Sequence, residues 1–150
     1  MGVAKALERL LRIRDIEEEQ RRLALESALG ELRDLERARE AAGAREREGR
    51  ELVRGSVKSG EWADRGAGLV ETATARKQAG VLAPRIAALE AESIQLRQKF
   101  LEKRVQRRQA ETLIEEAAAR DAGGLNRRSQ QNLDDWYGSH MHRERTDSKS

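Results

Sequence analysis

The chain has 150 residues, of which 37% are hydrophobic, 38% are charged and only 3% are aromatic. A compact globule of this length needs more bulky apolar side chains to offset the entropy of the chain, so the composition favours either a disordered chain or a long coiled coil. The net charge of +3 arises from intermixed acidic and basic residues, and the absence of cysteine excludes disulfides and thiolate metal sites.

Residues 4–53 predict the first long helix. This stretch contains no proline and consists mostly of Ala, Leu, Glu, Arg and Gln, which are strong helix formers. Apolar residues recur mainly in steps of three and four, the spacing that keeps side chains on one helix face. We expect this face to form the packing seam, with a slip of register between Leu23 and Leu25, close to Gly30. The residues of the predicted seam are Leu10, Ile13, Ile16, Leu23, Leu25, Ala28, Leu32, Leu35, Ala38 and Ala42.

A cluster of glycines predicts the turn of a hairpin over residues 54–69. Glycine loses more conformational entropy in a helix than any other residue, so Gly55, Gly60, Gly66 and Gly68 should interrupt one. Trp62 lies inside this segment. We expect it to pack at the tip of the hairpin, with an exposed contact as the alternative.

Residues 70–137 predict the second helix, whose apolar pattern is stricter. Its steps alternate between four and three, as the a and d positions of a coiled coil require. Pro84 either begins this helix or kinks it, and Gly123-Gly124 either ends it or is tolerated within it. The predicted seam consists of Leu82, Ile86, Leu89, Ser93, Leu96, Phe100, Lys103, Arg107, Ala110, Ile114 and Ala117.

These elements predict an all-α protein, a long antiparallel two-helix coiled-coil hairpin that forms a single domain over residues 1–137. A long amphipathic helix must bury its apolar stripe, and the nearest partner is the helix across the turn. Because the second helix is longer, it should extend past the first. Residues 138–150 are polar and are predicted to be a disordered tail.

This architecture leaves no room for an active site, because two packed helices have no interior that excludes water around a nucleophile, base or metal. We therefore expect no enzyme activity, no cofactor and no small-molecule substrate. His140 and His142 are the only histidines, and two ligands on a flexible segment make a poor metal site. No apolar stretch approaches the ~20 residues that span a bilayer, and charged residues from Glu8 to Arg14 interrupt any signal-peptide region. The expected location is the cytoplasm.

One charge cluster exceeds the mixed background, and it lies in the second helix. A basic helix can contact the phosphates of a nucleic acid, but here no aromatic side chains are interleaved to stack on bases. An acidic protein partner is at least as good an interpretation. The cluster consists of Arg97, Lys99, Lys103, Arg104, Arg107 and Arg108, opposed only by Glu102.

Three stretches resemble the flagellar export protein FliJ family. The opening run Leu7-Glu8-Arg9-Leu10-Leu11-Arg12-Ile13-Arg14-Asp15-Ile16-Glu17-Glu18-Glu19-Gln20-Arg21-Arg22-Leu23-Ala24 is similar to the N-terminal segment of that family. Phe100-Leu101-Glu102-Lys103-Arg104 is similar to its basic stretch in helix two, and Gln130-Gln131-Asn132-Leu133-Asp134-Asp135 to its C-terminal ending. The likeness covers most of residues 4–137, including the position of the turn.

The resemblance implies a non-enzymatic role in flagellar type III protein export, as part of bacterial flagellum biogenesis. In that family a two-helix coiled coil, similar to the rotor stalk of rotary ATPases, inserts into the hexameric export ATPase and promotes ring assembly. It also contacts the export-gate membrane protein and export chaperones. The implied location is cytoplasmic, peripheral at the inner face of the cell membrane.

The resemblance also implies two partner-binding surfaces, which should lie near each other where the helix ends meet. Pro84 and Gly123-Gly124 depart from the uninterrupted helix of the family and put the geometry of the ATPase-facing end in doubt. The alternatives to this function are a coiled-coil scaffold or holdase of another secretion assembly, including the injectisome, and a basic helical nucleic-acid binder. The implied partner-binding residues are Arg9, Arg12, Arg14 and Glu18 on the first helix, and Gln131, Leu133, Asp134 and Asp135 on the second.

Overall fold

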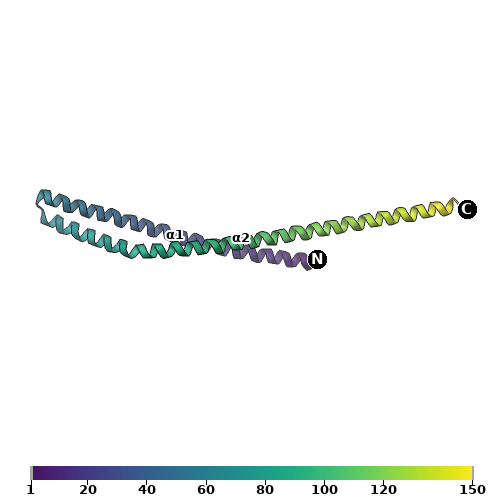
Figure 1. Ribbon diagram of the computed structural model, residues 1–150, viewed down its shortest axis with the longest axis horizontal. Coiled ribbons are helices and arrows are strands. Elements are labelled where there is room, and N and C mark those ends of the chain that lie inside the picture. The colour runs from purple at the N-terminus through teal and green to yellow at the C-terminus, as the bar shows by residue number, and fades with distance from the viewer. Residues whose placement is uncertain (1, 150) are drawn as a thin grey trace. The chain divides into compact units, whose positions relative to one another are not determined.

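The computed structural model describes residues 2–149, which form two long helices, α1 (Gly2–Ser59) and α2 (Trp62–Asp147). The two helices lie side by side in antiparallel orientation near the turn that joins them (Figure 1). No strand occurs between residues 2 and 149. The prediction of an all-α helical hairpin is therefore confirmed.

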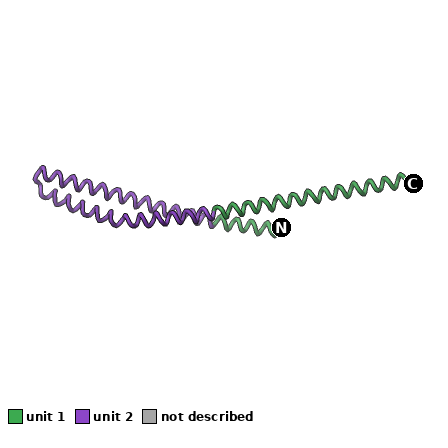
Figure 2. The backbone as a smooth tube through the Cα atoms, in the orientation of Figure 1, with its two compact units in different colours: residues 1–16, 104–150 green, residues 17–103 purple. Residues whose placement is uncertain are grey.

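The chain divides into two compact units (Figure 2). Residues 17–103, called the hairpin unit, contain the turn and the helical segments on either side of it. Residues 104–149 with the segment before Glu17 form the second, called the terminal unit. In the terminal unit α2 extends well past the start of α1 (Figure 2).

The turn is much shorter than the predicted segment of residues 54–69. Only Gly60 and Glu61 lie between the helices. Gly60 has a φ of 74°, a left-handed conformation that glycine adopts without strain, and its N–H donates to the carbonyl of Ser56 at 2.8 Å, which closes the C-terminus of α1. The glycines at positions 55, 66 and 68 were expected to interrupt helices, but each costs only about 1 kcal/mol, and the pairing of the two helices offsets that cost.

The seam predicted for α2 is confirmed. Each of its residues from Leu82 to Ala117 is buried or half-buried. The same alternation of four and three continues towards the turn through Ala79, Ala75, Thr72 and Gly68, all of which are also buried or half-buried. One face of α2 therefore packs along α1 without a break in register.

The seam predicted for α1 is wrong in most of its first half, and also at Ala38, which is exposed. Ile13, Ile16 and Leu23 are more than half exposed. Buried and half-buried positions instead recur in strict steps of four and three from Leu7 to Ser56, and Arg39 is the exposed exception among these described positions. No slip of register occurs near Gly30. The slip was predicted because only apolar residues were assigned to the seam, whereas polar side chains occupy several of its positions. The seam of α1 consists of Leu7, Leu11, Arg14, Glu18, Arg21, Leu25, Ala28, Leu32, Leu35, Ala42, Glu46, Gly49, Val53 and Ser56.

The helices of the hairpin unit approach each other closely at Gly49 and Gly68, which are both buried. A Cβ atom placed on Gly49 would lie 2.8 Å from the carbonyl oxygen of Gly68 and 2.9 Å from the backbone nitrogen of Thr72. A Cβ on Gly68 would lie 2.7 Å from the carbonyl oxygen of Gly49. Real Cβ contacts are not this short, so this crossing requires glycine on both helices.

α2 is one continuous helix, so neither Pro84 nor Gly123-Gly124 begins or ends it. The helix runs through Pro84 and through Gly123-Gly124. Pro84 lacks the N–H that would bond to the carbonyl of Gly80, but both residues are exposed, so water can satisfy that carbonyl. Residues 138–147, predicted as part of a disordered tail, continue the helix to Asp147. Local contacts support it there, including the pair of His140 and Glu144 one turn apart at 3.7 Å.

Candidate partner-binding surfaces

Polar seam residues form ion pairs within each unit. In the hairpin unit the Nζ of Lys103 donates to a carboxylate oxygen of Glu17 at 3.1 Å. In the terminal unit Arg107 lies 3.8 Å from a carboxylate oxygen of Asp15 and 2.8 Å from one of Glu111. These side chains are about one quarter to one half exposed, so each pair contributes modestly to stability. Two members of the predicted basic cluster are thus engaged within the coiled coil.

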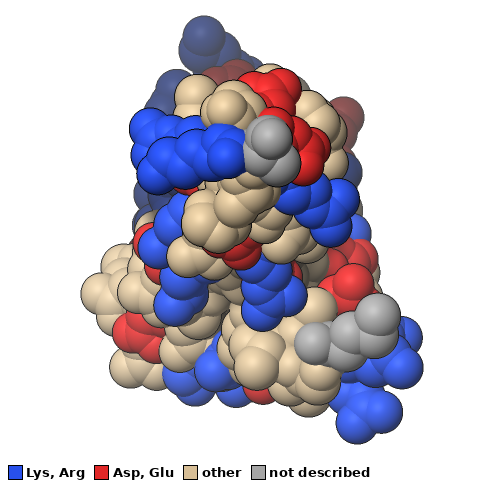
Figure 3. Space-filling model, turned by 90° about the vertical axis from the view of Figure 1, so that its right-hand side faces the viewer, with Lys and Arg blue, Asp and Glu red and all other residues tan. Residues whose placement is uncertain are grey.

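The remaining members of that cluster face solvent. Arg97 and Lys99 are exposed in the hairpin unit, and Arg104 and Arg108 are exposed in the terminal unit. Acidic and basic side chains are interspersed over the face drawn in Figure 3.

The four implied partner-binding residues of α1 have different environments. Arg9 and Arg12 are exposed and free to meet a partner surface. Arg14 is half-buried in the seam and donates to the amide oxygen of Gln106 at 3.1 Å. Glu18 is a half-buried seam residue of the hairpin unit. Arg14 and Glu18 therefore serve pairing of the helices, a role that the resemblance did not imply.

The implied partner-binding residues of α2 are all exposed, and within the terminal unit they do not lie beside Arg9, Arg12 and Arg14. Gln131, Leu133, Asp134 and Asp135 belong to a segment in which every described residue from Leu125 onward is exposed. In the terminal unit Arg14 contacts Gln106, and Gln131 lies about 25 residues further along α2, or roughly 38 Å. The expectation that the two surfaces lie near each other is not met within this unit.

Residues 118–147 of α2, called the overhang, carry an aromatic cluster that sequence reasoning missed. The ring of Trp136 stacks on that of His140 with centroids 5.0 Å apart and meets Tyr137 edge-on at 5.1 Å. Trp136 and Tyr137 are nevertheless more than half exposed. The signal was present in the spacing of Leu125, Leu133 and Trp136, which places apolar side chains on one face of the predicted second helix beyond the end of its predicted seam.

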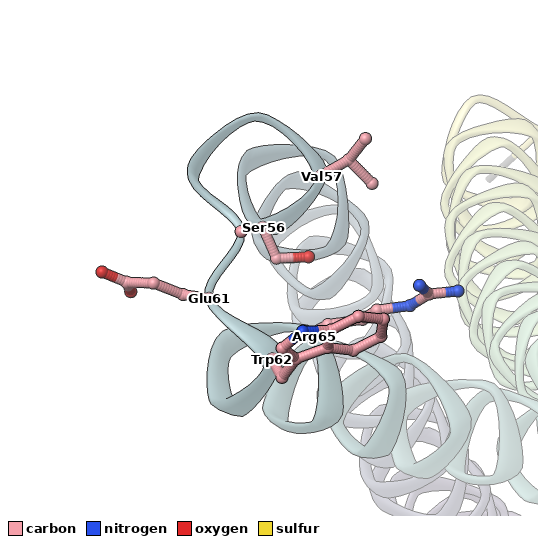
Figure 4. A pocket seen from close by; sticks show the side chains of 6 residues that line it. Ser56, Val57, Glu61, Trp62 and Arg65 are labelled. Atoms are coloured by element: carbon pink, nitrogen blue, oxygen red, sulfur yellow. The ribbon is translucent and has the colours of Figure 1, made fainter.

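The tip of the hairpin unit is a second exposed apolar surface. Trp62 is 77% exposed and Val57 is 74% exposed, so the expectation that Trp62 packs at the tip is wrong and the alternative of an exposed side chain holds. Both residues line a shallow depression beside the turn (Figure 4), with the guanidinium of Arg65 5.5 Å from the Trp62 ring. A hydrogen bond between the carboxyl groups of Glu61 and Asp64 raises the pKa of Glu61.

The described residues lack two features that would bear on function, a cluster of metal ligands and a membrane-spanning helix. Between residues 2 and 149, no three His, Asp or Glu side chains are grouped so that they could hold a metal ion. Neither of the described helices has an apolar stretch long enough to cross a lipid bilayer. The accessible features of the two units are therefore mixed charge and scattered apolar side chains.

Comparison with known proteins gives no match. No protein-family model, no curated protein and no solved structure matches the chain.

Proposed function

We propose that the chain is a non-enzymatic stalk that binds the hexameric ATPase of flagellar type III protein export. The proposal combines the sequence resemblance to the FliJ family with one structural observation, the overhang of a coiled-coil hairpin. The overhang is a single helix with its surface exposed, so a ring-shaped partner can surround it. A helix of about 10–12 Å diameter is narrow enough for the central hole of a hexamer.

The contacts proposed with the ATPase lie mainly on the overhang. Its exposed acidic pair, Asp134 and Asp135, can meet basic side chains of a ring, while Leu133 and Trp136 supply apolar contacts. Arg9 and Arg12 form a separate exposed basic surface on α1. The remaining proposed partners are the export-gate membrane protein and export chaperones, with the chain peripheral at the inner face of the cell membrane.

The test is the activity of the purified export ATPase with and without the chain. Stimulation of ATP hydrolysis is expected with the intact chain and is expected to be lost when residues 125–137 are deleted. A gentler variant, Leu133→Ala with Trp136→Ala, should reduce stimulation at least ~10-fold, since exposed apolar anchors of this kind often carry more than 1.4 kcal/mol of binding energy. The matched control is Val57→Ala with Trp62→Ala, which removes similar exposed side chains from the tip. If the intact chain neither binds nor stimulates the ATPase, the stalk proposal fails.

A coiled-coil scaffold of another secretion assembly is the second candidate, because exposed apolar residues at the tip and on the overhang suit any assembly partner. Binding to an injectisome ATPase in preference to the flagellar one favours it. A nucleic-acid binder has less support, since Lys103 and Arg107 are engaged by carboxylates of the coiled coil itself. If the chain bound nucleic acid and that binding weakened steeply with salt, the nucleic-acid binder would become the better-supported second candidate.

A further inference from the structure

The overhang is a helix whose own chain gives it little support. Every described residue from Leu125 onward is exposed, and the segment contains Gly123, Gly124 and Gly138. Each glycine costs a helix about 1 kcal/mol relative to alanine. Isolated helices are marginal in water, and most helical stability in proteins comes from packing of an apolar face. A surface that packs against the overhang would therefore stabilise its helix.

The apolar face of the overhang is not a continuation of the seam that packs on α1. Beyond Ala117 the seam positions become polar. The apolar residues reappear one position later along the chain, which turns the face by about 100° around the helix. The continued seam would contain Asp121, Gly124, Arg128, Gln131 and Asp135, whereas the new face, called the overhang face, contains Ala118, Ala122, Leu125, Ser129, Asn132 and Trp136, with Leu133 directly beside it.

We propose that the overhang face pairs with the overhang face of a second copy of this chain, in antiparallel orientation. The observation that selects a second copy is the order of charges beside the face. Arg128 precedes the centre of the face and Asp135 follows it, on the same side of the helix. An antiparallel copy reverses this order, so each Arg128 meets Asp135 of the other copy, and the pair forms twice.

The hairpin unit supplies the register for this pairing. There Glu46 lies on the seam, and the residue before it, Arg45, donates to Gln78 of the antiparallel helix at 3.1 Å. Gln78 follows by three residues the buried seam residue Ala75, whose neighbour Arg76 donates to a carboxylate oxygen of Glu46 at 2.8 Å. In the dimer, Ser129 of one copy and Asn132 of the other take the places of Glu46 and Ala75. The residue before Ser129 then lies opposite the residue three positions after Asn132, which brings Arg128 opposite Asp135.

Two further matches follow from that register without adjustment. Leu125 packs against Trp136 of the other copy, again twice by symmetry, which places the largest apolar side chains of the face in contact. Asp121 falls opposite His142 in the same flanking position as Arg128 and Asp135. In a parallel pair, flanking residues meet those five positions further on, so Arg128 would meet Leu133 and lose its carboxylate. The antiparallel arrangement alone pairs Arg128 with a charge.

The dimer is expected to be weak. Each copy offers Leu125, Leu133, Trp136 and Tyr137, which are 57–64% exposed. Burying so few side chains gives an interface below roughly 1,000 Å², typical of transient association, and a dissociation constant on the order of 10 µM. The dimer does not depend on the proposed function. If that function holds, the dimer covers Leu133 and Trp136 and thereby competes with the ATPase.

The first test is sedimentation equilibrium of the full chain across roughly 1–200 µM, a span centred on the expected dissociation constant. The average mass is expected to rise from 16.9 kDa towards twice that value. Arg128→Asp replaces two attractive pairs by two repulsive ones and should raise the dissociation constant more than ~10-fold, as should Asp135→Arg. The double variant R128D/D135R restores the pairs with reversed sign and should recover the original constant. Arg127→Asp changes the same charge one residue away, outside the flanking position, and is the matched control.

The second test fixes the orientation. The chain has no cysteine, so single substitutions report without background. A mixture of the Ser129→Cys chain and the Asn132→Cys chain should form the mixed disulfide faster than either forms a disulfide with itself. A chain that stays monomeric throughout, a double variant that does not recover, or dominant self-disulfides each overturn the proposal. A monomeric chain that still stimulates the ATPase overturns the dimer and leaves the proposed function standing.

Discussion

Replacing Gly49 by alanine is expected to destabilise the hairpin unit, although alanine is the better helix former. The intrinsic gain is about 0.8–1.0 kcal/mol. Against it stands the new methyl group, 2.8 Å from the carbonyl oxygen of Gly68 and 2.9 Å from the backbone nitrogen of Thr72. Backbone atoms cannot rotate away, so the helices must separate, and overpacking of this kind costs typically 1–3 kcal/mol or more. We expect a net loss of roughly 1–2 kcal/mol.

Gly30→Ala provides the matched control on the same helix. A Cβ on Gly30 meets nothing within 4 Å, so only the gain in propensity of about 1 kcal/mol remains. The two variants should therefore differ by roughly 2–3 kcal/mol in the free energy of unfolding. For a chain of this size that is a difference of about 4–12 °C in Tm, measured from the helical circular dichroism signal. A Gly49→Ala chain as stable as Gly30→Ala would show that the helices do not cross closely at Gly49 and Gly68.

Three more predictions address the register, an ion pair and the tip. Arg21→Leu should raise the free energy of unfolding by about 1 kcal/mol, because Arg21 is half-buried in the seam. Gln20→Leu on the exposed side should change it by less than half as much. Equal effects of the two variants in urea titrations would contradict the seam of α1. The hydrogen bond from Arg76, with Arg50 nearby, lowers the pKa of Glu46 below its ordinary 4.5. The ionised carboxylate therefore stabilises the fold above that pH, and the stabilisation is lost as the pH falls through the lowered pKa. The Tm of Glu46→Gln should accordingly lie below that of the unmodified chain at pH 7, and the difference should shrink by pH 3. Trp62→Ala should change the free energy of unfolding by less than about 0.5 kcal/mol, since the side chain is 77% exposed, and a larger loss would mean that the tip is packed.

The seam of α2 could be predicted from the sequence because most of its positions are apolar, and its few polar positions have apolar seam positions before and after them. The seam of α1 could not, because its pattern contains two candidate faces. Ile13, Ile16 and Leu23 form the more apolar face there, yet Arg14, Glu18 and Arg21 lie on the face that packs. The choice depends on what α2 presents opposite, including Lys103 and Arg107, and a single helix does not contain that information.

The turn was predicted at the right place but with the wrong length, because glycine has two opposite uses. Gly60 provides the left-handed turn, whereas Gly68 permits a close helix crossing and belongs in a helix. Composition does not distinguish these uses, since the second depends on Gly49 of the other helix. For the candidate site, the resemblance implied Leu133 and its acidic neighbours as a partner-binding surface, but Trp136 was missed although it lies within the predicted second helix.

The two-residue turn has a consequence for how the chain acquires its fold. Residues around Gly49 and Thr72 are close in sequence, so bringing them together costs much less entropy than joining Glu17 to Lys103. We expect folding to start beside the turn and to proceed away from it, one layer at a time, as contacts of low sequence separation form fastest. During synthesis α1 emerges first with its apolar seam uncovered. The hairpin unit can begin to cover that seam as soon as the first turns after Trp62 leave the ribosome, long before the overhang exists.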